Sequence, residues 1–129
     1  MRKNVHIIGA LCFGIMGLVL LGSVKRGALP YVGWPLIALL HKPFITIVIM
    51  LVMSFFGGIV PDILDPPYSP KHRRFAHSKA LLAILLVLWG ITLIALLNQS
   101  SLGLCAIYYM LLGYISHLAL DSLTPSGLW

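Results

Sequence analysis

The stretch ALLAILLVLWGITLIALL, residues Ala80–Leu97, contains no charged side chain and a single hydroxyl group. Its length is close to the roughly 20 apolar residues that a helix needs to cross the hydrocarbon core of a bilayer. Backbone N–H and C=O groups must find partners within the chain in lipid, and a helix bonds them within one segment. The stretch therefore predicts a membrane-spanning helix.

Three further uncharged apolar runs occur in the chain, Val5–Val24, Phe44–Val60 and Leu102–Leu120. Of the 129 residues, 60% are hydrophobic and only 9% are charged, whereas a soluble domain has about 25% charged residues. We therefore predict that residues 1–129 form a single membrane-embedded domain. Its expected fold class is all-α, a polytopic helical bundle of about four transmembrane helices. Cys12 and Cys105 fall inside these runs and are expected to be buried apolar residues.

A shorter apolar segment, Gly27–Leu40, is interrupted by Pro30 and Pro35. It also contains Tyr31 and Trp34, residue types that are enriched where a membrane meets water. The composition favours an interfacial or re-entrant segment over a further span, and both alternatives remain open.

The acidic residues are few and gather in two places. The chain has no glutamate and three aspartates: Asp62 and Asp65 follow the second run, and Asp121 ends the fourth. A carboxylate in a spanning segment costs on the order of 2.5–3.5 kcal/mol at the centre of the bilayer. A chain with so few acidic residues is therefore expected to use all three.

Histidines accompany these aspartates. His117 and Asp121 are four residues apart, so a helix places them on one face. Asp62 and Asp65 are three apart, and the two prolines that follow predict a stiff turn for them. His72 and His77 are five apart, a spacing that favours a loop for at least one of them.

Both clusters are expected at the same membrane face, because two spans separate them. His6, at the start of the first span, is expected at that face too, and whether it approaches the clusters remains open. Six basic residues fall on this side and three on the other. The positive-inside rule therefore predicts a multi-pass protein of the cytoplasmic membrane with its motifs on the cytoplasmic side.

Two sequence blocks carry a family resemblance. They contain Pro61, Asp62, Asp65, His72, Arg73, His77 and Ser78, and then Gly113, Tyr114, Ser116, His117, Asp121, Thr124, Pro125 and Gly127. These blocks resemble the motifs of small membrane-bound metal-dependent hydrolases, some of which are labelled LexA-regulated inner-membrane hydrolases. Two departures occur: Arg74 stands where glycine is usual in that family, and Ala76 where threonine is frequent.

The resemblance implies a hydrolase that depends on a divalent transition metal, one or two ions. Mixed imidazole and carboxylate ligands favour zinc, with manganese or iron as alternatives. A catalytic zinc has three protein ligands and an open position for water, and it lowers the pKa of that water to about 7. The candidate metal ligands are Asp62, Asp65, His72, His77, His117 and Asp121. Asp65 is also the candidate proton acceptor.

Basic residues flank the histidine pair of the first block, and Arg73 is the candidate for binding a phosphate oxygen. A site at headgroup depth favours a phosphoester of a lipid or lipid-linked substrate. A metal ion transporter or channel is the main alternative, and a non-catalytic membrane protein with a structural metal is another. Nucleic-acid binding is not expected, because membrane topology disperses the net charge of +6. The sequence does not indicate the oligomeric state.

Overall fold

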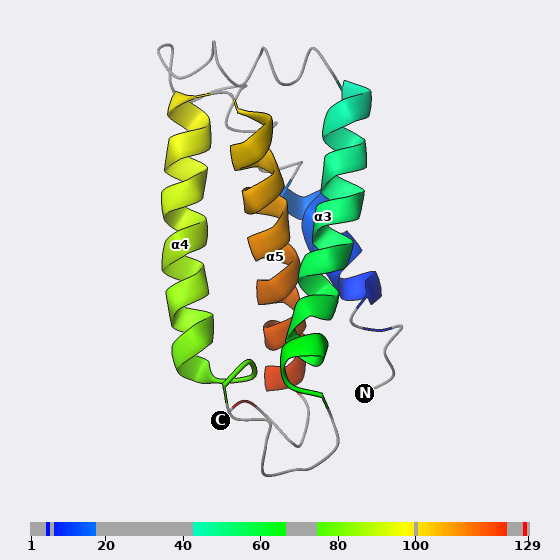
Figure 1. Ribbon diagram of the computed structural model, residues 1–129, viewed down its shortest axis with the longest axis vertical. Coiled ribbons are helices and arrows are strands. Elements are labelled where there is room, and N and C mark those ends of the chain that lie inside the picture. The colour runs from blue at the N-terminus through cyan, green and yellow to red at the C-terminus, as the bar shows by residue number, and fades with distance from the viewer. Residues whose placement is uncertain are drawn as a thin grey trace.

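The computed structural model describes residues 5, 7–17, 43–66, 75–99, 101–123 and 128. Within these ranges it contains helices and no strands. Three helices are long and apolar enough to cross a membrane: α3 (Pro43–Leu64), α4 (Lys79–Asn98) and α5 (Leu102–Ser122). They stand side by side as a bundle (Figure 1). The all-α fold class and three of the four predicted spans are confirmed.

The first predicted span is described only in part. Ile7–Gly17 forms a shorter apolar helix and Val5 is described as helical too, while residue 6 and residues 18–24 lie outside the described residues. Gly27–Leu40 lies outside the described residues as well, so the choice between an interfacial or re-entrant segment and a further span stays open.

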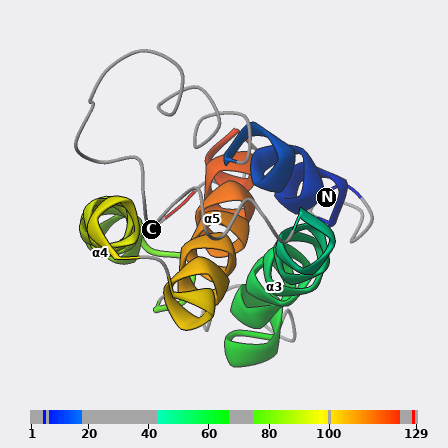
Figure 2. The same ribbon diagram turned by 90° about the horizontal axis from the view of Figure 1, so that it is seen from above.

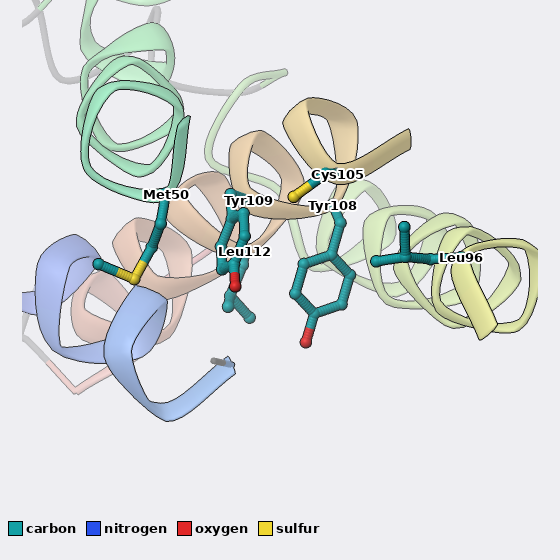
Figure 3. Close-up of a cluster of buried hydrophobic side chains, with 6 residues drawn as sticks. All are labelled: Met50, Leu96, Cys105, Tyr108, Tyr109 and Leu112. Carbon is teal, nitrogen blue, oxygen red and sulfur yellow. The ribbon is translucent and has the colours of Figure 1, made fainter. Parts of the chain in front are cut away.

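Helix α5 is the centre of the bundle. Helices α3 and α4 both pack against it, and the view along the bundle places α5 between them (Figure 2). Burial follows this arrangement, because α5 buries more of its length than α3 and α4 buries least. One hydrophobic cluster, most of it contributed by α5, fills the bundle: Met50, Leu96, Cys105, Tyr108, Tyr109 and Leu112 (Figure 3). Cys105 is buried there as predicted, whereas the prediction for Cys12 is wrong, since Cys12 is exposed on the outer side of the N-terminal helix.

Glycines let α3 and α5 approach to backbone contact. A Cβ placed on Gly113 would lie 3.0 Å from the Cα and carbonyl carbon of Ser54, and closer still to the Ser54 carbonyl oxygen. A Cβ on Gly57 would meet the backbone of Met110 in the same way. Small residues serve this purpose in membrane helices, where close van der Waals packing holds helices together. The contact fixes α5 against the last turns of α3.

The described polar residues of the two sequence blocks lie at one end of the bundle. Helix α3 ends there, α4 begins there and α5 ends there (Figure 1). The N-terminal helix begins at this end too, because Gly9 packs against Leu120 while Gly17 packs against Leu112 and Tyr108 further along α5. The prediction that both clusters share one face is confirmed for their described members. His6 itself is outside the described residues.

The end of α3 differs from the predicted one. The run was expected to end at Val60 and to be followed by a turn, but the helix continues through Pro61 to Leu64. Proline lacks the N–H that would bond the carbonyl four residues back, yet the next turn closes with a hydrogen bond of 3.0 Å from Asp65 N–H to the Pro61 carbonyl. Asp62 therefore lies on the last helical turn and Asp65 directly after it.

Candidate metal centre

His117 is held on α5 by a contact with the backbone of α3. Its Nδ1 lies 2.7 Å from the carbonyl oxygen of Gly58, and the side chain is fully buried. A carbonyl oxygen only accepts hydrogen bonds, so Nδ1 carries the proton of the neutral ring and Nε2 presents its lone pair on the opposite side. The close α3–α5 approach at Gly113 brings this carbonyl within reach.

His77 lies in the turn that leads into α4. The next residue, Ser78, is the N-cap of the helix, and its Oγ accepts a hydrogen bond of 3.1 Å from Leu81 N–H. This cap fixes the point at which the turn ends and the helix begins. His77 is itself buried, and its ring faces that of His117 with 5.4 Å between the ring centroids. The prediction of loop geometry for at least one histidine of the first block is confirmed at His77.

Two carboxylates approach both imidazoles at Nε2. Asp121 Oδ2 lies 3.3 Å from Nε2 of His77 and 3.4 Å from Nε2 of His117. Asp62 Oδ1 lies 3.8 Å and 3.7 Å from the same two nitrogens. Asp121 and His117 share one face of α5, as the four-residue spacing predicts. Two carboxylate oxygens from different helices therefore approach the same two imidazole nitrogens, and the set whose ligand atoms all lie within 4.8 Å of one another is Asp62, His77 and His117.

These distances suit ligands of a common metal ion better than hydrogen bonds. Direct N–H···O bonds are about 2.7–3.2 Å long, and the four separations are all longer. Four ligand atoms at zinc distances of about 2.0–2.2 Å in a tetrahedron are separated by about 3.3–3.6 Å. The Asp121 contacts fall within that range and the Asp62 contacts just above it. One atom each from Asp62, His77 and His117 also lies within 4.8 Å of the others.

The chemistry of the four groups also favours a cation. The Gly58 carbonyl places a proton on Nδ1 of His117, so in the neutral ring the Nε2 lone pair faces two carboxylate oxygens, which are themselves acceptors. Acceptors crowded together in a buried place repel one another unless positive charge lies between them. Imidazole nitrogen and carboxylate oxygen are the ligands that zinc takes in catalytic sites. The residues present therefore fit a divalent transition metal.

Asp65 lies on another side of His77. Its Oδ2 is 3.9 Å from Nδ1 of His77, the ring nitrogen that points away from Asp62 and Asp121, and it accepts a hydrogen bond of 3.2 Å from Ala76 N–H. The Ala76 carbonyl in turn accepts a hydrogen bond of 3.2 Å from the Tyr114 hydroxyl. The predicted role of Asp65 as proton acceptor stays a prediction; its described contacts are with the turn that carries His77.

Two predicted site residues, His72 and Arg73, lie outside the described residues. Sequence reasoning missed the Gly58 carbonyl and the backbone of Ala76, because a backbone group leaves no residue-type signal. Tyr114 is a motif position in the sequence, and its hydrogen bond to Ala76 spans 38 residues, so no local signal indicates it.

The match to a family model agrees with the membrane architecture. Residues 1–128 match the model of the family described as YdjM inner membrane protein. The chain belongs to the YdjM inner membrane protein family. Neither the curated proteins nor the solved structures include a match to it.

Membership of the YdjM family places the chain in the inner membrane, and its three long apolar helices are suited to crossing that membrane. The family description names a location and no chemical activity. The chemistry of this YdjM family member therefore depends on its own residues.

Proposed function

We propose that the chain is a membrane-bound metal-dependent hydrolase that acts on a phosphoester of a lipid or lipid-linked substrate. The observation that carries the proposal is that two carboxylate oxygens, one from Asp62 and one from Asp121, each lie 3.3–3.8 Å from the Nε2 atoms of both His77 and His117 at the end of the bundle. Asp62, His77, His117 and Asp121 would hold the ion, with His72 as a further candidate from the sequence. A bound divalent metal supplies a Lewis acid and lowers the pKa of water.

The degree of burial supports a site open at one side. Both histidine side chains are almost fully buried, while the Asp62 side chain is 27% exposed. A catalytic site needs such an opening, since substrate and water must reach it. The buried imidazoles hold their positions behind the partly exposed Asp62 carboxylate, which keeps the front of the site accessible.

The apolar surroundings of that opening support a lipid. Large hydrophobic side chains at this end of the bundle are strongly exposed, Phe75 at 77% and Leu123 at 82%. Phe75 precedes His77 by two residues and Leu123 follows Asp121 by two, so both lie beside the candidate ligands rather than at mid-span. Ile63 and Leu64 extend the same exposed apolar surface beside Asp62. The apolar part of an amphiphile can therefore pack against these side chains and present its polar bond at the site.

Positive charge beside the site supports an anionic group in that substrate. Lys79 is exposed at the first turn of α4, two residues after His77. The sequence adds Lys71, Arg73 and Arg74 in the preceding segment. An arginine can bind two phosphate oxygens at once, and Arg73 is the residue proposed for that role.

Turnover of defined lipids tests the proposal. The purified full-length protein in detergent is given mixed phospholipids and polyprenyl phosphates, with and without a chelator. We expect chelator-sensitive release of a headgroup or phosphate, lost in Asp121→Asn and kept in Ser122→Ala, a change at the exposed neighbouring position. Uptake of metal into sealed vesicles without any product would support the transporter instead. Metal binding with neither turnover nor uptake would support a structural metal.

A further inference from the structure

The turn that carries His77 is tied to α5 and to the residue that follows α3 through the backbone of one residue, Ala76. Ala76 N–H donates to Asp65, at the end of α3, and the Ala76 carbonyl accepts from the Tyr114 hydroxyl of α5. Ala76 itself is 1% exposed. Both backbone polar groups of the residue that directly precedes His77 are therefore fixed, one by the residue that follows α3 and the other by a side chain of α5.

The same contacts set the direction of the His77 ring. Asp65 Oδ2 lies on the Nδ1 side of the ring at 3.9 Å, while Asp121 Oδ2 lies on the Nε2 side at 3.3 Å. The distance to Asp65 is longer than a hydrogen bond, so the carboxylate acts on the ring through its charge and favours the tautomer with the proton on Nδ1. His117 has the matching arrangement, with the Gly58 carbonyl at its Nδ1. Each imidazole has an acceptor on its Nδ1 side and presents Nε2 to the carboxylate pair.

We propose that Tyr114 and Asp65 are positioning residues for His77. Asp65 binds the N–H of Ala76 and Tyr114 binds its carbonyl, so that Nε2 of His77 points at Asp62 and Asp121. The inference rests on the proposed metal site but adds two residues that need not touch the ion. Groups that orient a ligating imidazole typically contribute about 10–100-fold to metal affinity. It also explains why alanine suffices at position 76, since both partners bind the backbone.

Matched tyrosine variants test the inference. Tyr114→Phe removes only the hydroxyl that bonds Ala76. Tyr109→Phe is the control, because Tyr109 lies on the same helix, is fully buried and has a hydroxyl with no hydrogen-bond partner among the described residues. Zinc affinity of the full-length protein is measured by competition with a chelator, and the cobalt form by its visible spectrum. We expect Tyr114→Phe to bind zinc about 10–100-fold more weakly with an altered cobalt spectrum, and Tyr109→Phe to match the wild type.

A second measurement needs no metal. Nitrogen-15 NMR of the metal-free protein reports which nitrogen of His77 carries the proton. We expect the proton on Nδ1 in the wild type and a changed Nδ1 and Nε2 pattern in Asp65→Asn and Tyr114→Phe, with His117 unchanged. The Asp65→Asn variant keeps an oxygen that can accept from Ala76 N–H but lacks the negative charge.

The outcomes separate this inference from the proposed function. Equal zinc affinity and equal His77 shifts in Tyr114→Phe and Tyr109→Phe would overturn it. A wild type that binds zinc but turns over no ester would overturn the proposed function and leave the inference standing. A wild type that binds no metal would overturn the metal site, and the His77 shifts would then decide the inference alone. Asp65→Asn with unchanged zinc affinity and unchanged shifts but lost turnover would return Asp65 to the role of proton acceptor.

Discussion

Replacing Gly113 by alanine tests how the fold builds the site. The added Cβ would lie 3.0 Å from two backbone carbons of Ser54, whereas carbon atoms pack at about 3.5–4.0 Å. Backbone atoms cannot rotate away, so α3 and α5 must move apart by about 0.5–1 Å. The bond of 2.7 Å between His117 Nδ1 and the Gly58 carbonyl would then stretch beyond hydrogen-bond length.

Three effects change the free energy of unfolding in Gly113→Ala. Overpacking costs about 1–3 kcal/mol, and the lost hydrogen bond about 0.5–1.5 kcal/mol. The better helix propensity of alanine offsets about 1 kcal/mol. We expect Gly113→Ala to lower stability by about 1–3 kcal/mol and to weaken zinc binding, because His117 loses the partner that fixes its tautomer.

Gly90→Ala is the control for this prediction. Gly90 lies in α4 and a Cβ there would meet nothing within 4 Å, so only the helix propensity changes and stability should rise by up to about 1 kcal/mol. Unfolding of both variants is followed in mixed micelles by titration with a denaturing detergent, and zinc affinity is measured alongside. Equal stability and equal zinc affinity of the two variants would refute the claim that close helix approach at Gly113 builds the site.

Two further predictions concern the helix ends and the topology. Ser78→Ala should lower stability by about 0.5–2 kcal/mol because Ser78 Oγ caps α4, whereas Ser101→Ala should have little effect because Ser101 makes no side-chain cap bond; thermal unfolding in detergent compares them, and equal losses would count against the cap. In a background without Cys12 and Cys105, cysteines at the exposed positions Pro66 and Leu123 should react with an impermeant thiol reagent from one side of the membrane, and a cysteine at Gln99 from the other. The positive-inside rule predicts that Pro66 and Leu123 react from the cytoplasm, and labelling of those two from opposite sides would rule out a single site.

Much of the fold follows from the apolar runs alone. Ala80–Leu97 and Leu102–Leu120 differ from the observed helices α4 and α5 by at most two residues at either end, because lipid leaves the backbone no alternative to a helix. Because two spans separate the Asp62–His77 cluster from the His117–Asp121 cluster, the sequence alone predicts that both clusters lie at the same end of the bundle. The spacing of His117 and Asp121 was enough to place them on one face.

The rest depends on contacts that the sequence does not encode locally. The helix passes Pro61 because tertiary packing outweighs a single missing hydrogen bond, and so Asp62 lies on a helix rather than in the expected turn. Asp62 and Asp65 have the same residue type and similar neighbours, yet one faces Nε2 and the other Nδ1 of His77. That difference arises from the position of the turn that precedes α4. Two long-range hydrogen bonds fix this turn, one donated by Ala76 N–H to Asp65 and one donated by the Tyr114 hydroxyl to the Ala76 carbonyl.

The metal content of the purified protein tests the central claim most directly. The full-length protein is equilibrated with zinc, passed through a desalting column and measured by elemental analysis, together with His117→Ala, Asp121→Asn and the control His41→Ala, a histidine outside both sequence blocks. We predict about one or two ions per chain in the wild type and in His41→Ala, and a large loss in the other two variants. Full metal content in His117→Ala and Asp121→Asn, or none in the wild type, would contradict the claim that these residues form a metal centre.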